Sequence, residues 1–210
     1  MMNFIKPKIN GCINKSFKEC IDNEEFINVI IKDNEIDESI SLKSLVFDSC
    51  IFENVDFSKI KLDRICLIDV VFKNCNLSNQ KFDKQFINRV CFINCKLVGT
   101  SFINCNIKDV EINSCNAMYM SFYESKIKNL KLIESNFTEA VFTNAEMKDV
   151  LFNNVDFYKA EFLQVKFDSL DFVTCNITCI QFDLKSLKGI TIDAFQCQNI
   201  VALFGVNVKV

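Results

Sequence analysis

One period governs most of this chain: from Leu42 to Ile192, every fifth residue is large and apolar. The series has 31 members, Phe holds 16 of them, and Ala117 is the one small exception. Two residues before each member stands a second, mostly small or medium-sized residue, for example Cys50 or Val55. The other three positions of each five are rich in Asn, Asp, Ser, Lys and Glu. Such a repeat decides what the chain can fold into.

A period of five excludes the ordinary elements, because an α-helix repeats every ~3.6 residues, a strand every ~2 and a coiled coil every ~3.5. A chain that turns inward twice in five residues can instead wind into a flat-sided coil. Four such sides make a coil of about 20 residues, which hydrogen-bonds to the next coil at the ~4.8 Å strand spacing. Residues 20 apart then stack, so we expect nearly eight coils and one continuous column of rings, formed by Phe82, Phe102, Phe122, Phe142, Phe162 and Phe182.

The ends of the chain depart from this period. Residues 1–40 are predicted to form an N-terminal cap and an imperfect first coil, because Phe26, Ile31 and Ile36 run one residue out of phase with Leu42. The corresponding slip is expected near residues 37–39. The β-helix itself is expected to span residues 41–192, with a small bulge where Gln80, Gln85 and Phe86 disturb the pattern.

The last segment, residues 193–210, is predicted to be a dimerisation element. Residues 193–204 can form a short amphipathic helix, and Gly205 suits its C-terminus. The apolar residues of this tail outnumber what one coil end can cover, so we expect a homodimer; a monomeric end-cap is the alternative. The expected interface residues are Phe195, Ile200, Leu203, Phe204, Val206 and Val208.

The composition excludes several classes of chemistry. Histidine is absent, which removes Ser-His-Asp and Cys-His triads, and only 4 glycines are present, too few for Gly-rich phosphate loops. No nucleophile–base pair or metal-ligand set is visible, so we expect neither an enzyme nor a cofactor. The net charge of −3 argues against direct nucleic-acid binding through a basic surface. Without an apolar stretch of membrane-spanning length or a secretory signal, we expect a cytoplasmic protein with no membrane association.

The twelve cysteines are interpreted as buried apolar filler. Cys75, Cys95 and Cys115 are 20 apart and should stack, but in-register neighbours point in parallel and form poor disulfides. The metal alternative would rest on Cys91 with Cys95, or Cys175 with Cys179. Neither pair has a partner pair at suitable spacing.

Two outward columns are expected on the rod. Asn54, Asn74 and Asn94 should form a ladder of hydrogen-bonded amides. The second column is apolar at nominally outward positions, and either the N-terminal segment or a partner could cover it. Its members are Ile51, Val71, Ile93, Ile133, Leu151 and Val173.

The five-residue pattern of a small residue, a polar residue, Leu or Phe and two polar residues resembles the pentapeptide-repeat family. The resemblance covers about residues 40–192. It implies an all-β, right-handed quadrilateral β-helix; the four-sided shape and the handedness come from the family.

Two segments are similar to the Qnr-type quinolone-resistance proteins within that family. One is VEINSCNAMYMSF, residues 110–122, in which a small Ala likewise interrupts the large residues; the other is the tail, residues 188–208. The resemblance implies a homodimer joined through the tail that binds DNA gyrase and topoisomerase IV, mimics B-DNA and protects these enzymes from fluoroquinolones. The unbroken period from 42 to 192 predicts that the projecting loops of several Qnr proteins are absent.

Charge divides the rod into two parts. Residues 41–130 hold 12 basic and 9 acidic residues, whereas residues 131–190 hold 6 and 9. The acidic end adjoins the tail and is the candidate partner-binding surface, although plain solvated charge is an equal alternative. Its members are Glu139, Glu146, Asp149, Asp156, Glu161, Asp168 and Asp171. The competing functions are a structural scaffold for an unrelated protein partner and an immunity protein against a DNA-targeting toxin or antibiotic.

Overall fold

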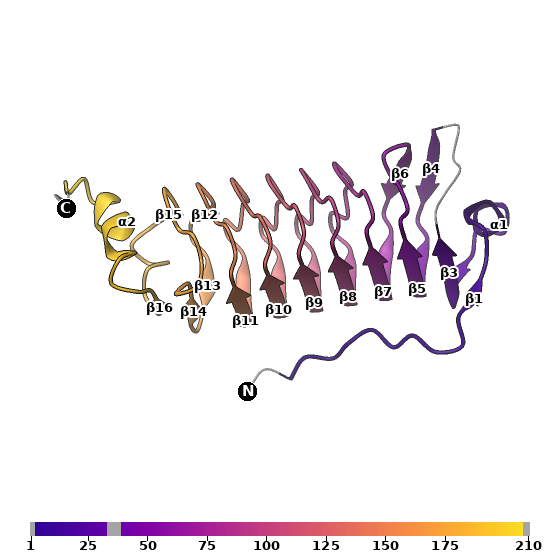
Figure 1. Ribbon diagram of the computed structural model, residues 1–210, viewed down its shortest axis with the longest axis horizontal. Coiled ribbons are helices and arrows are strands. Elements are labelled where there is room, and N and C mark those ends of the chain that lie inside the picture. Colours follow the sequence, from indigo (N-terminus) through magenta and orange to yellow (C-terminus); the bar gives the residue numbers. More distant parts are fainter. Residues whose placement is uncertain (1–2, 33–38, 208–210) are drawn as a thin grey trace.

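The computed structural model describes residues 3–32 and 39–207, which form a straight rod of stacked coils (Figure 1). Three residues used in the predictions above, Ile36, Asp37 and Val208, lie outside the described residues. All strand pairs are parallel, and the rod has about nine turns, so the predicted right-handed quadrilateral β-helix is confirmed. The expected count of nearly eight coils was slightly low, because the N-terminal residues add a turn of their own.

Six long strands form the main ladder. They are β5 (Val46–Glu53), β7 (Cys66–Lys73), β8 (Phe86–Ile93), β9 (Asn106–Asn113), β10 (Lys126–Ile133) and β11 (Glu146–Asn153). Short strands extend this sheet: β1 (Ile13–Asn14), β2 (Phe26–Ile27), β3 (Val29–Lys32) and β13 (Lys166–Phe167). The remaining pairs are β4 (Ile40–Lys43) with β6 (Ile60–Asp63), β12 (Glu161–Phe162) with β15 (Gln181–Phe182), and β14 (Leu170–Asp171) with β16 (Ile190–Thr191).

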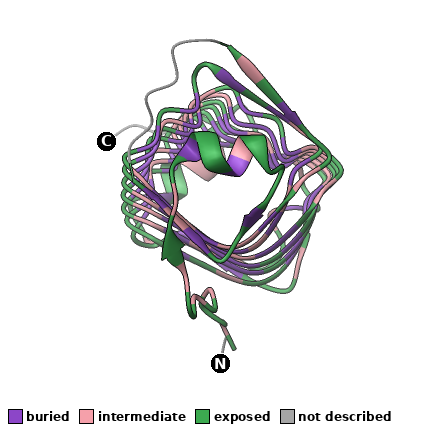
Figure 2. Ribbon diagram, turned by 90° about the vertical axis from the view of Figure 1, so that its right-hand side faces the viewer, coloured by how far each residue is buried: buried purple, intermediate pink, exposed green. Residues whose placement is uncertain are grey.

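The register is 20 residues, which gives each coil four sides (Figure 2). Non-glycine residues with positive φ recur at most corners, for example Asn54 and Asn74, because Asn tolerates the left-handed region better than most residues. We name the sides by one described coil. Side A is residues 126–128, side B 131–133, side C 136–138 and side D 141–143, and residues 20 apart belong to the same side. Each long strand covers sides A and B and bends between them.

The large apolar residue of each five and the smaller residue two positions before it fill the interior of the rod. The column from Phe82 to Phe162 is confirmed: its neighbouring rings are stacked, with centroids 4.5–5.7 Å apart and planes within 16°. Phe182 continues it at 5.5 Å but is tilted by 33°. A second stack joins Phe52, Phe72 and Phe92 at 5.1 Å. Stacked and edge-to-face rings therefore connect coils along the axis as well as within each coil.

Ala117 breaks the large-residue series without leaving the core. Its side chain is fully buried, and in the same coil Met120, with 0% exposure, occupies the position that Thr100 and Ala140 hold in the two neighbouring coils. A flexible Met can fill the volume that a missing Leu or Phe would leave. The exchange of a large and a small residue within one coil accounts for the interruption on packing grounds alone.

The N-terminal residues first run along the rod and then close one end of it (Figure 1). Helix α1 (Phe17–Asp22) begins with a capping box between Ser16 and Glu19, and it lies across the open end (Figure 2). Phe17 is 4% exposed and its ring centroid lies 5.5 Å from that of Phe26. Phe26 pairs with Phe47, an offset of 21 residues, which confirms the phase difference of the first coil.

The prediction of a bulge near Gln80 was wrong, because β7 and β8 pair with an unchanged 20-residue register. The disturbance is a break in the ladder of side D instead: β4 and β6 form a separate pair that projects from the stack (Figure 1). The buried Gln80 side chain takes the place of the backbone ladder. Its amide donates to the carbonyls of Phe57 and Ile60 at 3.0 and 2.7 Å, and its Oε1 accepts from the Leu62 N–H at 3.1 Å.

The C-terminal helix is shorter than the predicted residues 193–204: α2 spans Cys197–Ala202. Gln196 fixes it to the last coil, since its buried amide donates to the carbonyls of Phe172 and Cys175 at 2.8 and 2.7 Å. The Gln196 Oε1 also accepts from the Asp193 N–H at 2.9 Å, which turns the chain before the helix. Residues 193–196 form this anchor to the last coil, and they therefore do not extend the helix on its N-terminal side.

Candidate functional site

The seven acidic residues predicted as a partner-binding surface lie at one end of the rod but not on one side. Glu146 and Asp168 are on side A, Asp171 on side B, Asp156 on side C and Glu161 on side D. The other two, Asp149 and Glu139, are at corners. The structure therefore brings these carboxylates together along the axis and distributes them around the circumference.

Three of these carboxylates already have partners, and one of the three, Asp171, accepts from the Val173 N–H at 2.9 Å. Glu146 forms a 2.8 Å ion pair with Lys166 of the next coil, and the Lys166 ammonium holds the pKa of Glu146 below its usual value. Asp156 accepts from the Tyr158 N–H at 3.0 Å and from the Asn176 amide at 2.8 Å. Asp156 therefore supports its own turn in addition to carrying surface charge.

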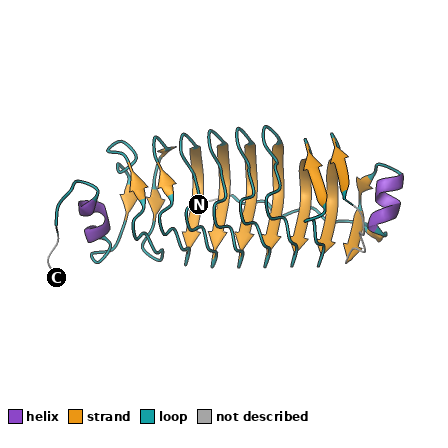
Figure 3. Ribbon diagram, turned by 90° about the horizontal axis from the view of Figure 1, so that it is seen from above, coloured by secondary structure: helices purple, strands orange, loops and turns teal. Residues whose placement is uncertain are grey.

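The tail presents apolar side chains to solvent. Phe195 is 86% exposed, Phe204 54% and Val206 50%, whereas Ile200 packs partly against the core. Leu203 is 38% exposed. All of these lie at the end of the rod opposite α1 (Figure 3). The predicted interface residues within the described chain thus share one end, and most of their apolar surface is unburied in a single copy.

Residues 3–12 form an extended segment, which we call the strap, along the corner between sides A and B (Figure 1). Its backbone bonds to corner side chains: the Lys8 N–H donates to Asp69 Oδ1 at 2.7 Å and the Ile5 N–H to Asp109 Oδ1 at 3.1 Å. The Asn129 amide donates to the Asn3 carbonyl at 3.0 Å. The strap therefore spans the coils from Ser49, which accepts from the Cys12 thiol, to Asn129.

A partly buried ion pair lies below the strap. Arg89 donates from Nε and Nη2 to the two oxygens of Asp69, both at 2.6 Å. Burial raises the pKa of Asp69, but the Arg89 guanidinium and the Lys8 N–H outweigh it, so this pKa lies below its usual value. Neither residue was predicted to matter, although they stand 20 apart at corner positions with opposite charge.

The apolar outward residues form two neighbouring columns of side B rather than one. Ile51, Val71 and Leu151 share the first column, and Ile93, Ile133 and Val173 the second. Near the strap, Lys131 lies over the Phe4 ring at 4.1 Å, and Ile51, Val71, Ile93 and Ile133 are half-buried. Leu151 and Val173 lie beyond Asn129, where the strap ends, and are 45% and 42% exposed.

Eight of the twelve cysteines are buried as expected, whereas Cys12 and Cys66 are half-buried and Cys179 and Cys197 are exposed, so the expectation of buried filler was wrong for these four. Cys75, Cys95 and Cys115 are buried and stacked, and the Cys95 N–H donates to Cys115 Sγ at 3.3 Å. Burial raises the pKa of the Cys50, Cys91 and Cys105 thiols to about 12. Within residues 3–32 and 39–207, no three acidic or thiol side chains are grouped so as to hold a metal ion. The predicted amide ladder is confirmed, with Asn54, Asn74 and Asn94 joined at 3.0 and 2.8 Å.

The part of the chain that the structure describes has no helix long and apolar enough to cross a membrane. Between Ile40 and Thr191, a stretch that is described throughout, the strands and bridges pair at the 20-residue register, so this stretch contains no inserted loop, although the ladder of side D is interrupted between β6 and Lys81. The sequence analysis did not identify one cluster, the five lysines that gather on side A. Three of them, Lys108, Lys128 and Lys148, stand at the 20-residue spacing and could have been found from it. The net charge of −3 for the whole chain gave no sign of this basic cluster.

Two family models match the sequence. One is described as a pentapeptide repeat region and matches residues 65–136; the other, described as pentapeptide repeats in 8 copies, matches residues 121–158 and 135–172. Together they cover residues 65–172, more than half of the chain. No curated protein matches the sequence significantly.

Among solved structures, the fold is similar to two trypsin-treated variants of QnrB1, a plasmid-mediated fluoroquinolone resistance protein. Their TM-scores are 0.60 and 0.59; each is 18% identical, and the alignment covers 87% of this chain and 89% of theirs. HetL, a pentapeptide-repeat protein involved in heterocyst differentiation regulation in the cyanobacterium Nostoc, has a TM-score of 0.41 at 11% identity, covering 85% of this chain and 97% of HetL.

Proposed function

Because this chain belongs to the pentapeptide-repeat family and has a fold similar to that of QnrB1, we propose that it binds a type II topoisomerase, DNA gyrase or topoisomerase IV. It protects the enzyme from fluoroquinolones, and it does so as a binding protein without catalysis. The observation that carries the proposal is the match to a fluoroquinolone resistance protein over 87% of this chain, including most of the rod.

The proposed mechanism is competition with duplex DNA. Glu139, Asp149, Glu161, Asp168 and Asp171 extend the acidic end around the rod, so a basic groove that encloses DNA meets carboxylates from several directions. A surface confined to one side would suit a flat partner better. The distribution around the circumference therefore supports a partner that surrounds the rod.

The proposed assembly is a homodimer through the tail. Phe195, Phe204 and Val206 expose apolar side chains at one end, and a second copy would bury them. Joining two such ends brings the acidic parts of both rods to the middle of a dimer of twice the length. Helix α1 lies at the outer end of each rod (Figure 3).

A gyrase supercoiling assay with ciprofloxacin, with and without this protein, tests the proposal. We expect micromolar protein to restore supercoiling that the drug inhibits, with no effect of equal concentrations of serum albumin. Supercoiling that stays inhibited at every protein concentration would contradict it.

A structural scaffold for an unrelated protein partner is the second candidate. The same fold is compatible with it, and the neutral balance of 18 basic and 18 acidic residues over 41–190 favours it. The scaffold predicts no change in the drug sensitivity of gyrase. The supercoiling assay therefore separates the two functions.

A further inference from the structure

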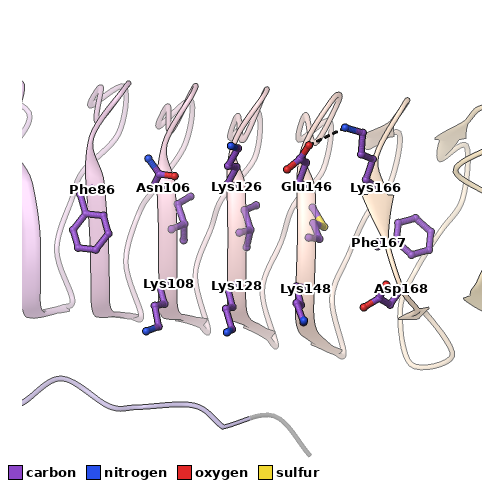
Figure 4. A pocket seen from close by; sticks show the side chains of 13 residues that line it. Phe86, Asn106, Lys108, Lys126, Lys128, Glu146, Lys148, Lys166, Phe167 and Asp168 are labelled. Atoms are coloured by element: carbon purple, nitrogen blue, oxygen red, sulfur yellow. Dashed lines mark hydrogen bonds and ion pairs between the residues drawn. The ribbon is translucent and has the colours of Figure 1, made fainter.

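Side A carries a groove of about 670 Å³ with a local charge opposite to that of the whole chain (Figure 4). Its lining includes five lysines against two carboxylates, Glu146 and Asp168, a local balance of +3. The five are Lys108, Lys126, Lys128, Lys148 and Lys166, all exposed. Since the whole chain has a net charge of −3, this side is a segregated basic surface.

The two lysine columns of the groove differ in a way that points to a ligand. In the first, Glu146 stands in register between Lys126 and Lys166, and it pairs with Lys166 at 2.8 Å. In the second, Lys108, Lys128 and Lys148 stand directly opposite one another in three successive strands, β9, β10 and β11. These three make no ion pair within the part of the chain that the structure describes.

Like charges directly opposite one another on neighbouring strands destabilise a sheet. Elsewhere on the rod the same register joins opposite or neutral groups, as in the pair of Lys73 with Glu53 at 2.7 Å and in the Asn54 amide ladder. Asp168 follows Lys148 in this column, but no ion pair joins the two among the described residues. The three neighbouring lysines are therefore a cost to the fold that a bound polyanion would remove.

The aromatic residues at the ends of the groove select the kind of polyanion. Phe86 is 45% exposed on β8 and Phe167 is half-buried on β13, and the lysines lie between them (Figure 4). From the rung of Phe86 to that of Phe167 is four coil spacings, or about 19 Å at ~4.8 Å each. A positively charged track next to an exposed ring is the arrangement that binds single-stranded nucleic acid, with the backbone on the lysines and a base on the ring.

We propose that side A binds single-stranded nucleic acid over about six nucleotides, with Lys108, Lys128 and Lys148 along the phosphates and Phe86 stacked on a base. The length follows from ~19 Å divided by a stacked rise of ~3.4 Å per nucleotide. The lysines of this surface are not members of the acidic set of the proposed function, although Glu146 and Asp168 of that set also line the groove; the test contains no topoisomerase.

The test is a fluorescence anisotropy titration of a fluorescein-labelled 15-nucleotide oligo-dT with the full chain at 50 mM salt. The variant is Lys108→Gln, Lys128→Gln and Lys148→Gln together. The matched control is Lys61→Gln, Lys81→Gln and Lys96→Gln, which makes the same change of net charge with exposed lysines of sides C and D. Thermal melting checks that all variants fold.

We expect the side A variant to bind at least tenfold more weakly and the control less than twofold. The slope of log affinity against log salt should fall by about 2 in the side A variant, since each lost phosphate contact on a single strand contributes ~0.7. Phe86→Ala should weaken binding about tenfold through lost stacking, whereas Tyr119→Ala, which removes an exposed ring between sides C and D, should leave it unchanged.

Three results would overturn the inference. The first is no binding of the oligonucleotide by the wild-type chain up to 100 µM, about the weak limit of non-specific binding. The second is an equal loss in the control variant. The third is full competition by polyglutamate with no effect of Phe86→Ala, which would assign the groove to an acidic protein segment instead.

Discussion

At the scale of single residues, the rod depends on rings that connect one coil to the next. Phe142 has 0% exposure and lies between Phe122 and Phe162, with centroids 5.2 and 4.5 Å away. It also meets the ring of Phe157 edge to face at 6.0 Å. A residue of this kind contributes to two coil interfaces at once, and a single coil has no core without its neighbours.

Phe142→Ala should therefore lower the free energy of unfolding by about 3–5 kcal/mol, because it leaves a cavity that the backbone ladder keeps open. Urea denaturation followed by far-UV circular dichroism measures it. Leu184→Ala, at a side chain that is 74% exposed, is the control and should change stability by less than about 0.5 kcal/mol. A midpoint for Phe142→Ala equal to that of wild type would mean that the ring is not in the core.

The cysteines give a second prediction at this scale. Cys179 and Cys197 are exposed, Cys12 and Cys66 are half-buried, and the other eight are buried. At pH 8 a thiol reagent should modify two thiols quickly in the folded protein, since burial raises the pKa of most interior thiols and keeps them protonated. After unfolding without reductant, close to twelve should react. Six or fewer reactive thiols would reveal disulfides instead.

The inward residues were predictable from the sequence because the period places each of them without reference to anything distant. Phe82 and Phe102 are 20 apart, and the spacing alone stacks their rings. The contacts of Asp69 and Asp109 with the strap were not predictable, since they join residues 61 and 104 positions apart. No periodic pattern in residues 3–12 specifies where that segment lies.

At the scale of elements, the two ends of the rod are closed differently. Helix α1 buries Phe17 and Cys20 in the core, so the N-terminal end is covered by the chain itself. Helix α2 buries none of its own residues, and Phe195 before it is 86% exposed. An open sheet edge invites further pairing unless something covers it. The asymmetry favours a second copy at the C-terminal end.

The tail deletion tests this assembly. The intact chain should elute as a dimer in size-exclusion chromatography with light scattering, and a chain ending at Ala194 should be a monomer or should aggregate. Phe195→Glu with Phe204→Glu is the milder variant, because it keeps the Gln196 anchor and should give a soluble monomer. An intact chain that is monomeric at 100 µM would contradict the prediction, since interfaces of standard size usually bind well below that concentration.

The ladder break at Gln80 shows the limit of pattern reading at this scale. The sequence locates the disturbance, because Gln80 is polar at an inward position. The sequence does not show whether an inserted residue or a hydrogen-bonding side chain compensates for the disturbed backbone pairing. The structure resolves it with three hydrogen bonds from one amide group, and the register is unchanged.

At the scale of the whole molecule, net charge hides the arrangement of charges. The acidic carboxylates lie around one end, whereas the lysines of side A form a single groove. The composition could not reveal this difference, because it depends on the side to which each position belongs. Once the 20-residue coil is known, the assignment follows from residue numbers alone.

Reversing Glu146, Asp149, Glu161 and Asp168 to Lys should weaken the binding of gyrase at least tenfold in surface plasmon resonance, since each site loses one attraction and gains one repulsion. Asp156 is left in place because its carboxylate supports a turn. The matched control reverses Asp22, Asp63, Glu111 and Glu124. These residues lie nearer the end of the rod that α1 covers, and this variant should retain binding. Equal binding by both variants would reject charge mimicry while keeping the partner.

The most direct test of the central claim is the amount of DNA cleavage that ciprofloxacin stabilises on gyrase. Cleaved plasmid is quantified on agarose gels at a fixed drug concentration, as the full chain is titrated to micromolar levels. The account predicts a dose-dependent decrease in linear DNA that rising salt weakens, because the contacts are electrostatic. An unchanged amount of linear DNA across the whole titration would contradict it and would leave the scaffold function in its place.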